Sequence, residues 1–173
     1  MIDTTNLAPQ AHAYFHQQDD QKATDEFSSV IAQQETVTGN GENVFALKND
    51  LAVAHLFAGN FDNAISLLKE CEAFYIGKND RGQLATVYAN LASVYEKKKQ
   101  VSQAISHYLR SLDNITDTNE SQQQKYFIHY ELSKLYLRKL NFVKVYAHYA
   151  GALSYKTKQT FLDKFFLWIT SPR

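Results

Sequence analysis

The sequence predicts an all-α fold: a right-handed superhelical solenoid of about four helix-turn-helix repeats, closed by a C-terminal capping helix. Two observations carry this prediction. The 173 residues include only 6 Gly and 2 Pro, which are too few for the many turns of a sheet protein. One pattern of apolar and small residues also recurs with a period of 40 to 41 residues. Recurrence at this spacing is typical of stacked helical hairpins.

The recurring pattern is a Leu, a small residue and a ring, followed nine positions after the ring by a second small residue and then an apolar one. Its clearest copy, with one further ring in front, consists of Tyr88, Leu91, Ala92, Tyr95, Ala104 and Tyr108. The other copies consist of Ala11, Tyr14, Ala23 and Phe27, of Leu51, Ala52, His55, Ala64 and Leu68, and of Leu132, Ser133, Tyr136, Val145 and Tyr149. The small residues let two helices approach closely, and the rings fill the space between hairpins. Each hairpin leaves one apolar face open, so stacking is needed to close the core.

The helix boundaries follow from this register and from polar breaks in the chain. The breaks between repeats are the stretches 36–42, 77–80 and 116–120, which are rich in Gly, Asn, Asp and Thr. Gly59-Asn60 and Leu140-Asn141 mark turns inside repeats. The expected helices span about 5–17, 20–35, 43–58, 61–76, 82–98, 101–115, 121–139 and 142–156. The repeats within the single domain 1–173 therefore cover about 4–36, 43–77, 82–116 and 122–156.

A final helix over about 158–169 carries a dense aromatic face. Phe161, Phe165 and Trp168 share one side of it, and Leu162, Phe166 and Ile169 lie beside them. One interpretation is a cap that covers the open face of the fourth repeat, as solenoids require. A second is a homodimer or partner contact through Phe161, Phe165 and Trp168. A third is contact with a membrane surface, because the aromatic residues are flanked by Lys156, Lys158, Lys164 and Arg173.

Charge and composition argue against several classes of protein. The formal net charge is +0 and the pI is about 7.0, so the chain lacks the basic excess of a nucleic-acid binder. The single Cys cannot form an internal disulfide, which favours a reducing compartment. The N-terminus MIDTTNLAPQ lacks the basic and apolar regions of a secretory signal, and no run of about 18 apolar residues exists for a spanning helix. We therefore expect a cytoplasmic protein.

The pattern resembles the tetratricopeptide repeat, in which W-x₂-L-G-x₂-Y precedes A-x₃-F and a final P. In the clearest copy Tyr88 stands for the Trp, Leu91-Ala92 for Leu-Gly and Tyr95 for the Tyr. The resemblance covers about residues 4–156. It departs from the family in lacking the final Pro. Its period of 40 to 41 residues also exceeds the usual length of roughly 34, which makes it a long-repeat variety.

The resemblance implies a non-catalytic scaffold or adaptor that binds a peptide segment of another protein in its concave groove. In this family the groove is lined by the first helix of each repeat. The candidate peptide-binding residues are accordingly His12, Asn49, Asp50, Val53, Asn90, Ser93, Glu96, Lys97, Phe127, Tyr130, Glu131, Lys134 and Arg138. Asn90 stands where the family often uses Asn to hydrogen-bond a peptide main chain. Asp50 and Glu131 occupy the matching places in neighbouring repeats.

The type of partner is narrowed by what the groove lacks. Family members that bind chaperone tails clamp a C-terminal carboxylate with Lys, Arg and Asn residues, whereas this chain has Ala8 and Asn49 where the first basic residue is expected. The mixture of Asn, acidic and aromatic residues instead favours an extended or helical peptide with apolar anchors and some basic character. The alternative to peptide binding is a self-assembling structural subunit that associates through the aromatic C-terminal helix.

No motif of catalysis, cofactor binding or metal binding is evident, so we expect neither an enzyme nor a cofactor. His12 and His16 have the i, i+4 spacing of metal ligands, with Asp19 or Asp20 as a third ligand, but there is no third His nearby. Cys71 lies seven residues after Ala64, where the repeat prefers a small residue, so it is interpreted as a packed thiol. The lysines at 97–99 suit the C-terminus of a helix.

Overall fold

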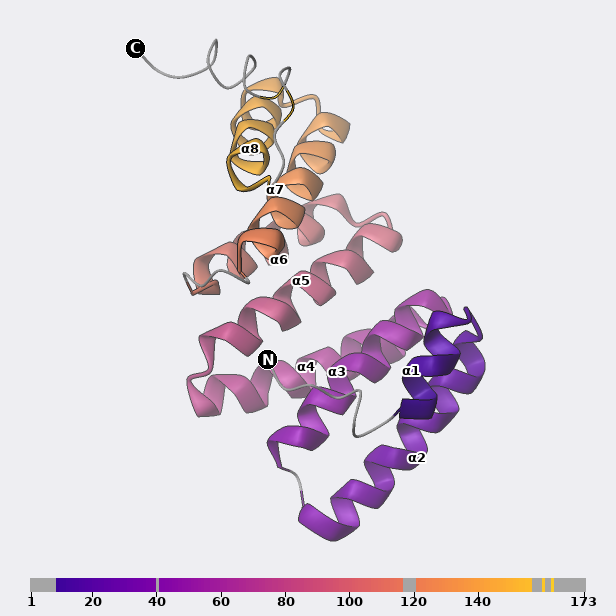
Figure 1. The fold of residues 1–173 in the computed structure, drawn as a ribbon. Coiled ribbons are helices and arrows are strands. Elements are labelled where there is room, and N and C mark those ends of the chain that lie inside the picture. The colour runs from indigo at the N-terminus through magenta and orange to yellow at the C-terminus, as the bar shows by residue number, and fades with distance from the viewer. Residues whose placement is uncertain (1–8, 40, 117–120, 157–159, 161–162, 164–173) are drawn as a thin grey trace.

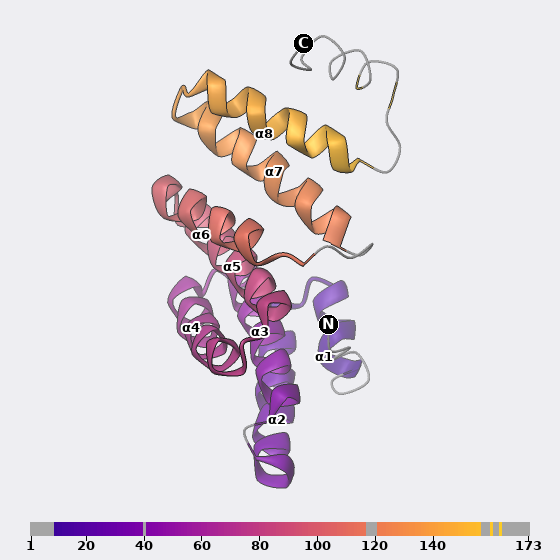
Figure 2. The same cartoon turned by 90° about the vertical axis from the view of Figure 1, so that its left-hand side faces the viewer.

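The computed structural model describes residues 9–39, 41–116, 121–156, 160 and 163 of the chain. The ordered elements in these ranges are all helices, and they pair into four hairpins that stack one after another (Figures 1 and 2). The helices are α1 (Pro9–His16), α2 (Asp20–Thr38), α3 (Glu42–Phe57), α4 (Phe61–Lys78), α5 (Arg81–Lys97), α6 (Val101–Asn114), α7 (Ser121–Arg138) and α8 (Phe142–Tyr155). The predicted all-α solenoid is confirmed.

The core runs through the array without a break, because each hairpin shares its interior with the next. One cluster of buried side chains joins α1, α2 and α3, a second joins α3, α4 and α5, and a third joins α5, α6 and α7. The small residues of the repeat lie at the closest approaches, and Ala52, Ala92 and Ala104 are fully buried. Each hairpin thus completes its core on the first helix of the following hairpin, as in other solenoids.

All four hairpins turn in the same way. The residue that ends each turn has a positive φ, and these residues are Gln18, Gly59, Lys99 and Leu140. In each case the next residue donates its backbone N–H to the carbonyl of the ring residue of the repeat five positions back, at 2.8 to 3.0 Å. The acceptors are Tyr14, His55, Tyr95 and Tyr136. The repeat is therefore as regular in its backbone as in its sequence, although only one of the four positions is a glycine.

A ring contact also recurs from the third hairpin to the fourth. Tyr95 stacks on His107 with ring centroids 5.1 Å apart, and Tyr136 stacks on His148 at 5.3 Å. Both residues of the second pair lie 41 positions after those of the first. The first helix of each hairpin is thereby fixed against its second helix through the same kind of contact.

Two helices run further than the sequence predicted. α2 continues to Thr38 although the stretch 36–42 was expected to be a loop. The hydroxyl of Thr36 donates to the carbonyl of Gln33 at 2.7 Å, so a Thr-rich segment stays helical until Gly39, whose φ of 69° ends it. α4 similarly continues to Lys78 and ends at Asn79, which has a φ of 54°. The helices end where a Gly or Asn adopts the left-handed conformation.

The cysteine is packed as its position predicted. Cys71 is fully buried, and its thiol donates to the carbonyl of Phe45 at 3.4 Å. Burial raises the pKa of this thiol to about 12, so it is not a nucleophile at neutral pH. The lysines at 97–99 likewise lie at the C-terminus of α5, where Lys97 is the last helical residue.

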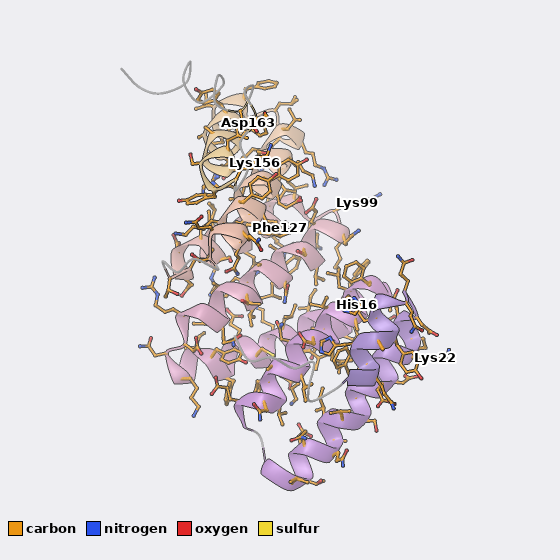
Figure 3. The ribbon with its side chains drawn as sticks, viewed as in Figure 1. His16, Lys22, Lys99, Phe127, Lys156 and Asp163 are labelled. Carbon is orange, nitrogen blue, oxygen red and sulfur yellow. The ribbon has the colours of Figure 1, made fainter. Side chains whose placement is uncertain are left out.

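Most of the predicted capping helix over 158–169 lies outside the described residues, and only Thr160 and Asp163 of it can be placed. The backbone N–H of Thr160 donates to Asp163 Oδ2 at 2.8 Å, and the N–H of Asp163 donates to Thr160 Oγ1 at 3.2 Å. Lys156 Nζ lies 2.7 Å from the same carboxylate at the end of α8 (Figure 3). Asp163 is buried, so this start of the segment is held against the array.

Candidate peptide-binding surface

Side chains of successive first helices meet along one face of the array, here called the inner face. His12 Nε2 of α1 lies 3.7 Å from Asp50 Oδ2 of α3. Asn90 Nδ2 of α5 donates to Asn49 Oδ1 of α3 at 2.9 Å. Arg138 Nη1 of α7 lies 4.0 Å from Glu96 Oε1 of α5. Each of these contacts joins two predicted peptide-binding residues, so the structure brings together side chains that are about 40 positions apart in the chain.

The Asn49–Asn90 pair lies at the centre of the inner face. The two residues are 41 positions apart, so they occupy the same place in neighbouring repeats, and both are half-buried. Their hydrogen bond uses one N–H of Asn90 and one lone pair of Asn49. The amide group of Asn49 and the carbonyl oxygen of Asn90 keep hydrogen-bonding capacity, one as donor and the other as acceptor.

A group of charged residues covers the inner face of α5 and α7. Glu131 is buried and pairs with Lys134 at 2.6 Å. Burial raises the pKa of Glu96, and the neighbouring Glu131 charge adds to this shift, while Lys134 and Arg138 oppose it. The hydrogen bond from Lys134 to Glu131 raises the pKa of the lysine. Since Lys134 is held by Glu131, the charges largely neutralise one another within the chain.

Two aromatic residues of α7 are exposed on the same face. Phe127 is 43% exposed and contacts Tyr108 edge-on, with ring centroids 6.2 Å apart. Tyr130 is 40% exposed and stacks on Tyr126 at 6.2 Å. Large rings that are packed on one side and open on the other are suited to anchor an apolar side chain of a partner.

The remaining predicted residues contribute less directly. Ser93 is half-buried, and its hydroxyl donates to the carbonyl of Ala89 and lies 3.2 Å from the hydroxyl of Tyr108. Val53 is half-buried and Lys97 is exposed. His12 packs edge-on against Phe27 and faces Asp50, whereas His16 is exposed. The part of the chain that the structure describes contains no cluster of three or more His, Cys, Asp or Glu side chains that could hold a metal ion.

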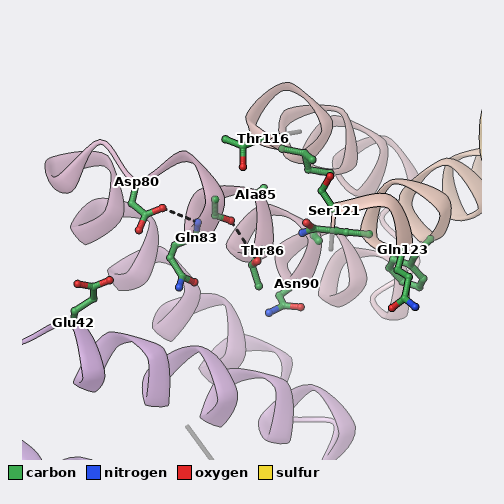
Figure 4. Close-up of a pocket in the computed structure, with 14 residues that line it drawn as sticks. Glu42, Asp80, Gln83, Ala85, Thr86, Asn90, Thr116, Ser121 and Gln123 are labelled. Carbon is green, nitrogen blue, oxygen red and sulfur yellow. Dashed lines mark hydrogen bonds between the residues drawn. The ribbon is translucent and has the colours of Figure 1, made fainter. Parts of the chain in front are cut away.

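A cleft of about 640 Å³ opens between the N-terminal halves of α5 and α7 (Figure 4). Its lining is mainly amide and hydroxyl groups, with two carboxylates and one aromatic ring. The lining residues are Glu42, Asp80, Gly82, Gln83, Ala85, Thr86, Ala89, Asn90, Ile115, Thr116, Ser121, Gln123, Gln124 and Phe127. Of the thirteen predicted binding residues, only Asn90 and Phe127 lie in this cleft.

The sequence contained a signal for the cleft residues that were missed. Glu42, Gln83 and Gln124 stand 41 positions apart, and each lies seven residues before one of the predicted positions Asn49, Asn90 and Glu131. A separation of seven residues returns to the same side of a helix. Extending the predicted stripe toward the start of each first helix would have found all three. Asp80 had no such signal, because it precedes α5 as its N-cap.

No described helix has the length and apolar character needed to cross a bilayer.

Comparison with known proteins agrees with this architecture. A family model described as tetratricopeptide repeat matches residues 87–123, which cover most of α5, all of α6 and the start of α7. No curated protein matches the chain. Among solved structures, the TPR-like repeats of a protein from Podosopora anserina described as a kinesin light chain align with a TM-score of 0.75. The alignment has 18% sequence identity and covers 95% of this chain and 83% of that one.

A point variant of the same repeats gives the same TM-score and identity, and the alignment covers 82% of its length. At this level of identity the likeness concerns the fold. The match to the repeat model and the likeness in fold agree with the period, the buried small residues and the shared turn geometry described above. Residues 87–123 are thus a tetratricopeptide repeat, and the chain is a solenoid of TPR-like repeats.

Proposed function

We propose that the protein is a non-catalytic interaction module that holds an extended peptide segment of a partner protein on its inner face. The fold is one that generally mediates contacts between proteins. The observation that carries the proposal is the Asn49–Asn90 pair beside an open cleft. Asn49 offers a donor and Asn90 an acceptor, which match the C=O and N–H groups of an extended backbone.

The arrangement of the pair favours binding over mere solvation. Asn49 and Asn90 are half-buried and hold each other in place, so less side-chain freedom is lost when a peptide binds. Phe127 and Tyr130 lie one helix further along and provide apolar anchors. The other predicted residues of the inner face, including Glu96, Lys97, Lys134 and Arg138, supply charged surroundings for these contacts.

The proposal is tested with peptides selected from a random dodecapeptide library on the purified chain. Asn90→Ala combined with Tyr130→Ala is expected to weaken the binding of a selected, fluorescently labelled peptide at least tenfold in anisotropy titrations. Gln103→Ala combined with Leu109→Ala, two exposed positions on α6, is the matched control and should bind like the wild type. Thermal melts must show that both variants are folded. A library without binders, or equal affinity for both variants, would contradict the proposal.

A second candidate function, self-assembly, is favoured by the far end of the fourth hairpin. Leu140, Phe142 and Val143 are 73%, 65% and 80% exposed. The equivalent positions of Leu140 and Val143 in the third hairpin hold Lys99 and Ser102, so apolar residues replace polar ones at this end of the array. Contiguous exposed apolar side chains of this kind mark contact surfaces. The contact would add to the predicted one through Phe161, Phe165 and Trp168, which lie outside the described residues.

Light scattering coupled to size-exclusion chromatography separates the two candidates. If the chain self-assembles, the wild type is a dimer at high concentration, and Leu140→Lys with Val143→Ser is a monomer. A wild type that stays monomeric over the whole concentration range would exclude self-assembly and leave peptide binding untouched.

A further inference from the structure

The cleft contains a row of side chains that occupy one position of the repeat. Glu42, Gln83 and Gln124 come from α3, α5 and α7 at intervals of 41 residues, and all three line the cleft. The row therefore crosses the first helices one after another, with a carboxylate at its first position and amides at the next two. A ligand that follows this row meets acidic chemistry at one end only.

The acidic end is formed by two carboxylates. Glu42 begins α3 and is exposed, and Asp80 lies beside it at the edge of the cleft (Figure 4). One oxygen of Asp80 accepts the backbone N–H of Gln83 at 3.0 Å, which leaves its second oxygen to a ligand. Cations that lie nearby in the chain are engaged elsewhere: Arg81 donates to the carbonyl of Asp113, and Lys78 lies over the Phe74 ring.

A buried hydroxyl reports the same negative surroundings. Tyr75 is 1% exposed, and its hydroxyl has no hydrogen-bond partner among the described residues. Burial raises the pKa of Tyr75, and the charges of Cys71, Glu42 and Asp80 raise it further. The negative potential of these carboxylates therefore reaches into the core next to the cleft, and a cationic group bound between them would be stabilised by it.

The other end of the cleft is apolar. Phe127 lies on α7, two first helices beyond Glu42, and is 43% exposed. Packed helices lie roughly 8–10 Å apart, so about 16–20 Å separate the two ends. An extended chain rises about 3.3 Å per residue, so this distance corresponds to about five or six residues of a peptide.

We infer that the cleft binds an extended peptide with an Arg or Lys side chain between Glu42 and Asp80 and an apolar side chain, five or six positions away, on Phe127. Its backbone lies along Gln83, Asn90 and Gln123. This inference rests on the proposed peptide-binding function and specifies the partner for it. The acidic end selects the charge of the ligand, and the distance to Phe127 selects the spacing of its two anchors.

The test uses the selected dodecapeptides and the full chain. The enriched sequences are expected to share a basic residue five or six positions from Leu, Ile, Phe or Met. Glu42→Gln with Asp80→Asn, which retains an N-cap for α5, should weaken the binding of such a peptide about tenfold. It should have little effect on the same peptide with Gln in place of the basic residue. Asp25→Asn with Asp62→Asn removes the same charge from two exposed positions outside the cleft and should leave the affinity unchanged.

The outcomes distinguish this inference from the function on which it rests. Peptides that depend on Asn90 and Tyr130 but bind equally to the Glu42→Gln, Asp80→Asn variant would overturn the basic anchor and leave peptide binding intact. Enrichment of acidic peptides, or of basic and apolar residues at no fixed spacing, would also overturn it. A library without any binder would overturn both.

Discussion

Two histidines face each other inside the fourth hairpin. His129 Nδ1 of α7 lies 3.1 Å from His148 Nδ1 of α8, a distance at which one nitrogen donates and the other accepts. The pair is therefore neutral. Burial lowers the pKa of His129 to about 4, and the charges of His148 and Lys125 act in the same direction. Burial also lowers the pKa of His148, with Lys144 adding to it. Tyr155 and Tyr136 stack on the two rings.

This pair predicts a loss of stability in acid. The pKa of His129 is lower in the folded chain than its ordinary value of 6.5, so the unfolded chain binds more protons. The contribution to the free energy of unfolding is complete above pH 6.5 and is lost as the pH falls toward about 4. Urea melts between pH 7 and pH 4.5 should show this decline, and His129→Gln should flatten it. His16→Gln, at an exposed position, should not change the slope. Equal slopes in both variants would contradict the assignment.

Gly151 makes room for this histidine pair. A Cβ at position 151 would lie 2.7 Å from Nδ1 of His129, closer than side-chain atoms approach each other. Gly151→Ala is therefore expected to lower the free energy of unfolding by about 1–3 kcal/mol, measured by urea denaturation. Gly77→Ala is the matched control, since that glycine is also helical but has nothing within 4 Å of the added carbon. It should stabilise the protein by up to about 1 kcal/mol.

A double variant connects the Gly151 effect to its cause. If the clash with His129 is responsible, His129→Ala should recover part of the stability lost in Gly151→Ala, giving a non-additive cycle. Additive losses would show that the added methyl group acts on something else.

At the scale of elements, the turns inside the hairpins differ in cost. Leu140 adopts a φ of 54° and is 73% exposed, so it bears the left-handed conformation without a packing contribution of note. A residue with a side chain pays about 1–2 kcal/mol for this conformation, whereas glycine does not. Leu140→Gly is expected to raise the free energy of unfolding by about 1 kcal/mol. Gly59→Leu, at the equivalent turn of the second hairpin, should lower it by a similar amount. Thermal and urea unfolding both report these changes, and a destabilised Leu140→Gly would show that the side chain packs.

The helices were predictable from the sequence because their packing residues repeat. Leu91, Ala92 and Ala104 are each fully buried, as the period of the pattern required. The ends of α2 and α4 were less predictable, because Thr36 can remain helical by bonding back to Gln33. The left-handed turn at Leu140 had no signal in its residue type.

The inner face was predictable only in part. The first-helix positions Asn49, Asn90 and Phe127 followed from the repeat, and the structure places Asn49 and Asn90 in contact. The cleft also depends on how far α7 stands from α5, which is set by packing at the end of α6 and has no periodic signal. Asp80 enters the cleft as a helix cap, so its role depends on the path of the chain between helices.

At the scale of the whole molecule, the array has one thin junction. Among the described residues, α6 contacts α7 less extensively than α2 contacts α3 or α4 contacts α5. The cleft opens at this junction, between α5 and α7. In a solenoid the coupling between neighbouring repeats is set by their shared surface, so the fourth hairpin should open more readily than the others.

Hydrogen exchange measured by mass spectrometry tests this prediction. Amides of α7 and α8 are expected to exchange faster than those of α3 to α5. A peptide bound in the cleft should slow exchange in α7. Ile128→Ala removes a fully buried side chain at the junction and should speed exchange in α7 and α8 while leaving α3 and α4 unchanged. Uniform protection over all helices would contradict a weak junction.

The row of Glu42, Gln83 and Gln124 has a consequence for the length of the array. Because the inner face repeats after 41 residues, excision of residues 83–123 would join Gly82 to Gln124, which stands in the place of Gln83. The phase of every helix face would be kept across the junction. The shortened chain would read a peptide about three residues shorter, since one helix spacing of roughly 10 Å corresponds to that length of extended backbone. The unit of inheritance and the unit of recognition would then be the same segment, so that gain or loss of one copy changes the length of the recognised sequence in fixed steps.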